Sequence, residues 1–214
     1  MVVVFDVDGT LLDTYPVVRQ TYIDVLSHHV PPIPYNETLL QSFFGPPLYD
    51  TFLGLVHDEE KARELVNLYR QQNKLNNPQY LKVFPEATHF IETLHAQGVK
   101  LGILSNKIKD AIFEGFALVG FPNIFDIIIG YEDVRHPKPH PEGLLHIREL
   151  FQEDLIMVGD SIYDMEVARR AGAPAIGVTW GNTSRNDLMA SGATKVVETF
   201  TELMEAIHLL SSAQ

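Results

Sequence analysis

The sequence predicts an α/β fold, a doubly wound Rossmann-like parallel sheet with an all-α domain inserted after its first strand. Short apolar runs alternate with helical patterns from Val83 onwards, and this alternation is typical of parallel sheets covered by helices. Residues 15–82 instead show several helical patterns and no strand pattern. We therefore assign residues 1–14 and 83–214 to an α/β core domain, and residues 15–82 to a helical domain.

The composition is that of a soluble globular chain with an excess of acidic groups. Of the 214 residues, 45% are hydrophobic and 21% are charged, and 28 acidic against 16 basic residues give a net charge of −12. This charge disfavours nucleic acids and anionic membranes as partners. No apolar run approaches the ~20 residues that a transmembrane helix needs. Cysteine is absent, which is compatible with the cytoplasm as the expected location.

The first part of the chain should form one strand followed by helices. Val2–Phe5 is an unbroken apolar run of β-branched and aromatic residues, which suits a strand buried on both faces. Residues 15–30 have roughly helical apolar spacing, and Pro31-Pro32-Ile33-Pro34 should end that helix. Three more helices are expected in this domain, at Glu37–Phe44 after an Asn36 cap, at Leu48–Val56, and at Glu59–Asn77 after an Asp58 cap.

The remaining chain should alternate between strands and helices. The expected strands are Val99–Leu104, Asp126–Gly130, Leu155–Val158, Ala175–Val178 and Lys195–Val197. The expected helices run from Pro85 to Gly98 and over Ile108–Leu118, Pro141–Phe151, Tyr163–Ala171 and Thr201–Leu210. A glycine is a frequent helix end, and we expect Ser211–Gln214 to be frayed.

Two carboxylates follow the first strand directly, in the stretch Asp6-Val7-Asp8-Gly9-Thr10. A buried carboxylate is costly unless it is paired or bound to a metal ion, and Gly9 permits a turn that a side chain would obstruct. Ligands of open α/β sheets bind at the carboxyl ends of the strands. A polar turn explains many single aspartates, but two of them at this position favour a functional site.

Polar residues also follow the second strand and precede a later helix. In Ser105-Asn106-Lys107 the Ser105 hydroxyl can donate to a phosphate oxygen, or it can simply cap the next helix. In His136-Pro137-Lys138-Pro139-His140-Pro141 the prolines restrict the backbone of Lys138, although most lysines are solvated. We predict no metal pair from His136 and His140, because the prolines favour an extended chain and histidines four residues apart converge mainly on a helix.

The stretch Gly159-Asp160-Ser161-Ile162-Tyr163-Asp164 follows another apolar strand. Ser161 and Asp164 have the spacing of a capping box, so Asp164 has a structural role available. Asp160 has no such role, and an acid at the carboxyl end of a buried strand needs a cation.

Together, these four stretches resemble the four signatures of the haloacid-dehalogenase superfamily, in the same order and each at a strand end or helix start. A dehalogenase usually lacks the second aspartate of the first signature, so Asp8 favours phosphoryl chemistry. The resemblance implies that Asp6 is the nucleophile and Asp8 the general acid/base. It further implies phosphate binding by Ser105, Asn106 and Lys138, a Mg²⁺ cofactor held by Asp6, the Asp8 backbone carbonyl and Asp160, and support of that ion by Asp164.

The helical domain lies where this superfamily carries its cap, and residues 44–52 resemble the cap segment of its phosphoglycolate-phosphatase and bacterial pyrophosphatase branches. This implies a Mg²⁺-dependent phosphatase acting on a small phosphorylated metabolite as a monomer or dimer. An inorganic pyrophosphatase, a β-phosphoglucomutase-like isomerase and a catalytically inactive regulatory protein are the alternatives. Candidate substrate contacts in the cap, which solvated helix faces would explain equally well, are Tyr15, Arg19, Arg70 and Asn73.

Overall fold

The computed structural model describes residues 1–29 and 32–212 and contains the predicted parallel sheet. Six strands pair in the order β5-β4-β1-β6-β7-β8, and every neighbouring pair is parallel. The strands are β1 (Val2–Phe5), β4 (Lys100–Leu104), β5 (Ile127–Ile129), β6 (Leu155–Gly159), β7 (Ala175–Val178) and β8 (Lys195–Val197). The α/β fold class is therefore confirmed, and each predicted strand lies within one or two residues of its expected bounds.

Strand β1 occupies the middle of the sheet and is buried on both faces. It pairs with β4 on one side, where Val3 is opposite Leu101, and with β6 on the other, where Val3 is opposite Ile156. Because side chains alternate along a strand, Val3 and Phe5 enter one hydrophobic cluster while Val2 and Val4 enter another. This double burial explains why the sequence of β1 is continuously apolar.

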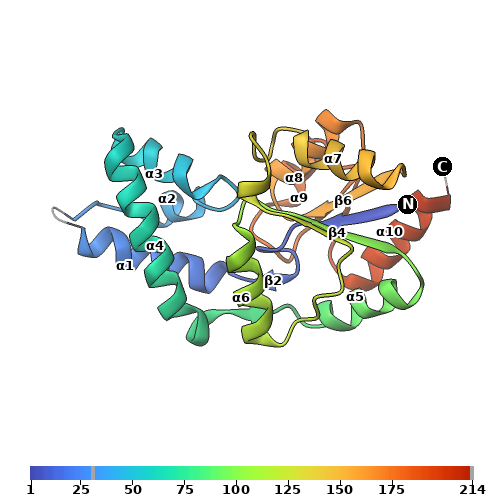
Figure 1. Ribbon diagram of the computed structural model, residues 1–214, viewed down its shortest axis with the longest axis horizontal. Coiled ribbons are helices and arrows are strands. Elements are labelled where there is room, and N and C mark those ends of the chain that lie inside the picture. Colours follow the sequence, from blue (N-terminus) through green and yellow to red (C-terminus); the bar gives the residue numbers. More distant parts are fainter. Residues whose placement is uncertain (30–31, 213–214) are drawn as a thin grey trace.

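Helices cover both faces of the sheet (Figure 1). On one face the hydrophobic cluster includes residues of α5 (Ala87–Ala96), α6 (Lys109–Val119) and α10 (Phe200–Ser212). On the other face it includes residues of α7 (Glu142–Phe151), α8 (Ile162–Ala171) and α9 (Arg185–Ala190). None of the described helices is long and apolar enough to cross a membrane.

Four helices lie to one side of the sheet, at the left of Figure 1, and enclose a hydrophobic cluster of their own. They are α1 (Tyr15–His28), α2 (Glu37–Gln41), α3 (Leu48–Val56) and α4 (Glu59–Tyr80). The predicted caps are present, because the Asn36 side chain accepts from the Leu39 N–H and Asp58 accepts from Glu60 and Lys61. Since this cluster contains only residues of the 18–69 segment, it supports the predicted cap domain, whose boundaries stay a prediction.

Several predictions about short elements were wrong. Residues 15–82 are not free of strands, because β3 (Lys82–Val83) pairs in antiparallel fashion with β2 (Leu12–Asp13). Helix α9 and the 3₁₀ turn η1 (Tyr131–Asp133) were not predicted from the sequence. Two-residue strands and single turns are too short to produce a hydrophobic period. Strand β2 leads from the sheet into the four helices and β3 leads back to it. Because β2 and β3 pair, these two connections lie side by side.

Predicted chain ends and helix ends differ in smaller ways. Helix α1 ends at His28, before the predicted end at residue 30, and α10 continues through Ser212 where we predicted fraying. The predicted helix stop at Pro31 and the fraying of Ala213 and Gln214 lie outside the described residues.

Candidate active site

Three neighbouring strands end at one edge of the sheet and bring the predicted polar residues together. Asp6 follows β1, Ser105 follows β4, and Asp160 follows β6. All three side chains are buried. Because β1 is hydrogen-bonded to both β4 and β6, the loops after these strands must meet.

A cluster of three buried carboxylates forms the centre of this edge. One carboxylate oxygen from each of Asp6, Asp160 and Asp164 lies within 4.8 Å of the others. Asp160 is enclosed by backbone, since a Cβ atom added to Gly9 or to Gly181 would lie 2.3 Å from Asp160 Oδ2. Gly9 also has a φ of +77°, a conformation that side chains disfavour. Glycine at position 9 is thus required both for the turn and for the close approach of Asp160.

Lys138 is the cation of this cluster. Its Nζ lies 2.6 Å from Asp164 Oδ1 and 3.1 Å from Asp6 Oδ1, and the residue is only 3% exposed. Burial by itself would lower the pKa of Lys138, but the charges of Asp164 and Asp6 outweigh burial and raise the pKa above its ordinary value. Lys138 is therefore a buried ammonium group and not a solvated lysine.

The two carboxylates nearest the centre are not fully compensated by this lysine. Burial raises the pKa of Asp6 to about 6, against the opposing charge of Lys138 and with the charges of Asp164 and Asp8 adding to the rise. Burial, followed by the charges of Asp164 and Asp6, also raises the pKa of Asp160 well above its ordinary range. Ionising both groups in this environment requires additional positive charge.

The donor set fits a hard divalent cation. Among the described residues, the Asp160 side chain accepts only long hydrogen bonds, both of 3.3 Å, from Thr10 Oγ1 and the Asn182 N–H. A buried carboxylate with so few partners has capacity for a metal ion. Carboxylate oxygens are the ligands that Mg²⁺ prefers, so Asp6 and Asp160 are suited to hold such an ion.

Asp164 is held by its own helix as well as by Lys138. Its Oδ2 accepts from the Ser161 N–H at 3.0 Å and from the Ser161 hydroxyl at 2.6 Å. The Asp164 N–H donates to Ser161 Oγ in return. The predicted capping box is therefore confirmed, and it fixes Asp164 beside the lysine.

Asp8 has a partner that sequence reasoning missed. Lys107 Nζ lies 2.8 Å from Asp8 Oδ1, and both side chains are partly exposed. Lys107 follows β4 within the stretch Ser105-Asn106-Lys107. The sequence therefore indicated its place after that strand, but not its contact with Asp8 in the loop after β1. Thr10 and Asn182 were also missed; Thr10 lies within the first stretch, whereas the loop containing Asn182 carries no comparable sequence signal.

Ser105 and Asn106 have different positions. The Ser105 side chain is buried, and its polar interaction with Asp6 opposes the rise in the pKa of Asp6. The Asn106 side chain instead accepts from the Lys138 N–H at 2.9 Å and donates to the backbone oxygens of Lys138 and Gly45. Asn106 thus fixes the Lys138 backbone against the helical segment, and its predicted contact with phosphate stays a prediction.

A cavity of about 540 Å³ lies over the carboxylates, between the sheet edge and the four helices. Asp6, Asp8 and Asp160 line it from the sheet, while Arg70 and Asn73 line it from α4. Two other candidate contacts do not line it. Tyr15 and Arg19 both bond to Glu37, the tyrosine hydroxyl at 3.0 Å and the guanidinium Nη2 at 2.7 Å.

Comparison with known proteins agrees with this geometry. Residues 3–178 match the family model described as haloacid dehalogenase-like hydrolase. The chain is 31% identical over 212 residues to the pyrophosphatase PpaX of Anoxybacillus flavithermus, covering 98% of this chain and 97% of the relative. It is 32% identical over 205 residues to PpaX of Bacillus velezensis, covering 94% of each. 

A solved structure of similar fold also belongs to the haloacid dehalogenase-like hydrolases. The haloacid dehalogenase-like hydrolase from Bacteroides fragilis superposes with a TM-score of 0.86 at 29% identity, over 94% of this chain and 98% of the other. The match of the family model spans both the buried carboxylate cluster and the helices above it. The chain belongs to the haloacid dehalogenase-like hydrolase family.

Proposed function

We propose that this hydrolase cleaves a phosphate ester or phosphoanhydride of a small molecule through a phosphorylated Asp6. The observation that carries the proposal is a buried carboxylate, Asp6, in contact with the buried ammonium of Lys138 at the floor of a cavity. A carboxylate can form a covalent acyl-phosphate intermediate when the transferred charge is stabilised. Lys138 and the Ser105 hydroxyl lie where they would supply that stabilisation.

Each side chain has a defined task in this reaction. Asp6 attacks phosphorus, and the bond between phosphorus and the leaving oxygen breaks as the aspartyl-phosphate forms. Asp8 protonates the leaving oxygen and then removes a proton from the water that hydrolyses the intermediate. The contact with Lys107 holds Asp8 at the cavity, on the same side as Asp6.

Mg²⁺ held by Asp6, Asp160 and the Asp8 carbonyl would supply positive charge to the phosphoryl oxygens and offset the repulsion between the buried carboxylates. Asp164 would support it by holding Lys138 in place. The excess of acidic groups elsewhere in the chain gives an anionic substrate no attraction, so binding depends on these local charges.

Inorganic pyrophosphate is the first substrate to test, because the relatives that cover nearly the whole chain are named pyrophosphatases. A small phosphomonoester such as 2-phosphoglycolate is the second, since the cavity of about 540 Å³ has room beyond the phosphoryl group. Arg70, which lines that cavity from α4, would contact the part of the substrate away from Asp6. We expect such a substrate to be met in the cytoplasm, without a nucleic acid or membrane partner.

The test is phosphate release with Mg²⁺ from pyrophosphate, 2-phosphoglycolate, β-glucose 1-phosphate and p-nitrophenyl phosphate. Asp6→Asn should abolish release without unfolding the protein, because the amide cannot attack phosphorus. Asp154→Asn is the matched control, since Asp154 is exposed and precedes β6, at the opposite end of the sheet. Release that persists in Asp6→Asn would refute the proposal. Conversion of β-glucose 1-phosphate to its isomer without net phosphate release would assign the chain to the isomerases instead.

A further inference from the structure

The turn around Lys138 brings two histidines together on the outer surface. We expected His136 and His140 to be separated by an extended chain, and that expectation was wrong. The His140 N–H donates to the Pro137 carbonyl at 2.9 Å, which closes a turn. The two imidazole rings consequently lie 4.5 Å apart, centroid to centroid, at an angle of 38°.

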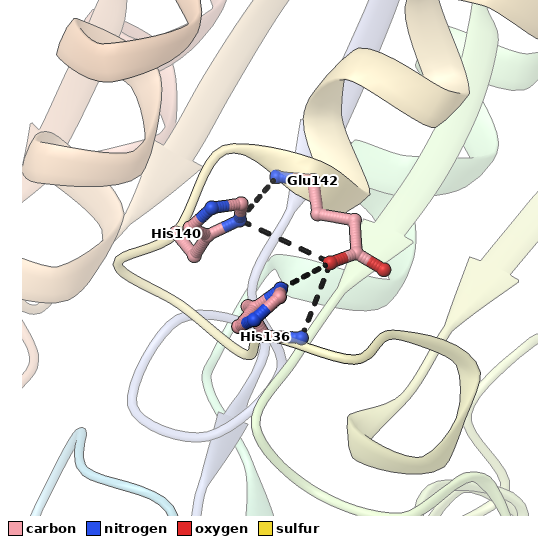
Figure 2. Close-up of side chains that lie close together, drawn as sticks. All are labelled: His136, His140 and Glu142. Carbon is pink, nitrogen blue, oxygen red and sulfur yellow. Dashed lines mark hydrogen bonds and ion pairs between the residues drawn. The ribbon is translucent and has the colours of Figure 1, made fainter.

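Glu142, in the first turn of α7, completes the group (Figure 2). Its Oε2 lies 2.9 Å from His136 Nδ1 and 4.0 Å from His140 Nδ1. The carboxylate is held in this position by backbone, because Oε1 accepts from the Arg135 N–H at 2.8 Å and Oε2 from the His136 N–H at 3.2 Å. One ligand atom from each of the three side chains lies within 4.8 Å of the others.

We propose that His136, His140 and Glu142 form a surface site for a divalent transition-metal ion of the Zn²⁺ class. Two imidazole nitrogens and one carboxylate oxygen are a ligand set that proteins use for zinc, and imidazole suits zinc, copper and nickel more than magnesium. Ligands bonded to one ion at about 2.0–2.2 Å in tetrahedral geometry lie roughly 3.3–3.6 Å apart. The two distances from Glu142 Oε2 bracket this separation, so small rotations of exposed side chains would suffice.

Binding requires one proton to move. His140 Nδ1 accepts a long hydrogen bond of 3.3 Å from the Glu142 N–H; the ion would replace this N–H at the Nδ1 lone pair, and water would then accept from the Glu142 N–H. The His136 Nδ1 proton that is shared with Glu142 Oε2 would leave to solvent or be replaced by the Nε2 tautomer as the ion binds. Water would fill the remaining coordination position, because His136 and His140 are exposed, with side chains 62% and 49% accessible.

This site differs in chemistry from the buried carboxylate cluster and is independent of the proposed function. The buried cluster offers only oxygen ligands, whereas two of the three surface ligands are nitrogen. The two sites are nevertheless joined by the chain, because Lys138 lies between His136 and His140. An ion at the surface would link this turn to α7 and restrain the backbone that positions the buried lysine.

Co²⁺ titration of the whole protein in excess Mg²⁺ tests the site, since Mg²⁺ occupies oxygen-only ligands while Co²⁺ in a protein site of low coordination number absorbs visible light more strongly than hydrated Co²⁺. Zn²⁺ affinity then follows from competition with Co²⁺. We expect His136→Ala and His140→Ala to weaken binding at least about tenfold, because loss even of a supporting contact costs that much. His89→Ala is the control, as His89 is an exposed histidine on α5, and it should bind like the parent.

Glu142→Gln is a second variant that preserves the size and the hydrogen-bond acceptor for the Arg135 N–H, so a fold defect and a ligand defect can be told apart. It should weaken Co²⁺ binding while its unfolding temperature without metal stays near that of the parent. Equal Co²⁺ affinity in the parent and both histidine variants would overturn the proposal. Asp6→Asn should keep this binding although it loses hydrolysis, so the site and the proposed function can fail separately.

Discussion

Replacing Asp6 by Asn should remove a pH-dependent loss of stability from the cation-free protein. Burial raises the pKa of Asp6 from 3.8 to about 6, so the folded state binds its proton more tightly than the unfolded state does. The resulting stabilisation is fully present below pH 3.8 and is lost as the pH rises through about 6. Asparagine does not titrate, and the variant should therefore lack this loss.

The expected size follows from the two pKa values. At about 1.4 kcal/mol for each pH unit between them, the parent should lose about 3 kcal/mol of unfolding free energy that the Asp6→Asn variant keeps. Asp160 changes the result in the same direction, because the Asp6 charge contributes to its raised pKa. With excess Mg²⁺ at neutral pH, the parent should instead be more stable than the Asp6→Asn variant. An ion that binds only the folded state stabilises it, and the variant has lost one carboxylate ligand.

The assay is urea unfolding from about pH 4 to about pH 8 in a chelator, followed by circular dichroism and by the fluorescence of Trp180, the single tryptophan. The quantity of interest is the difference in unfolding free energy between parent and variant at each pH. Asp154→Asn serves as the control, because Asp154 is exposed. The reasoning is refuted if, in the chelator, the unfolding free energies of the parent and the Asp6→Asn variant change with pH in parallel. Such a result would mean that burial does not raise the pKa of Asp6.

Three other changes probe the chemistry of the site. Replacing Mg²⁺ by Ca²⁺ should inhibit phosphate release, because Ca²⁺ takes more ligands at longer distances; equal rates with the two ions would contradict the coordination assigned to Asp6 and Asp160. Asp8→Asn should slow turnover about 10²–10⁴-fold, and with p-nitrophenyl phosphate it should release one equivalent of nitrophenol and stall as a phosphorylated protein, detected by stopped-flow absorbance and intact mass. A flexible replacement of Gly45-Pro46-Pro47 should change selectivity between pyrophosphate and 2-phosphoglycolate more than the rate with the nitrophenyl ester; equal losses for all substrates would make the loop merely structural.

The positions of Asp6 and Asp160 at strand ends were predictable because each residue follows a strong local pattern. A continuous apolar run identified β1, β6 and the residues that follow them, and strand ends at one sheet edge must meet. Helix caps such as Asn36 and Asp58 were equally local, since each bonds to a backbone N–H two or three residues away. Local patterns of this kind can be recognised in a single sequence, because the residues involved are close together in the chain.

Contacts between loops could not be predicted in the same way. The Lys107–Asp8 ion pair joins residues 99 positions apart, and the Asn182 N–H reaches Asp160 across 22 positions. The turn that brings His136 and His140 together is closed by a hydrogen bond from the His140 N–H to the Pro137 carbonyl, whereas the proline pattern alone favoured an extended chain. Short strands β2 and β3 exist only because the two connections to the helical segment pair with each other.

The arrangement of the buried charges indicates what the site was selected for. A fold optimised for stability alone would not place Asp6 and Asp160 where burial raises the pKa of each carboxyl, because hydrophobic residues would occupy the same positions at lower cost. Lys138 offsets part of that cost but contacts Asp6 and Asp164 rather than Asp160. The uncompensated charge faces a cavity open to small molecules. Buried carboxylates with raised pKa values beside a cavity are expected where a cation and an anionic substrate bind together. The same arrangement explains why the folded protein should be less stable without the cation than with it.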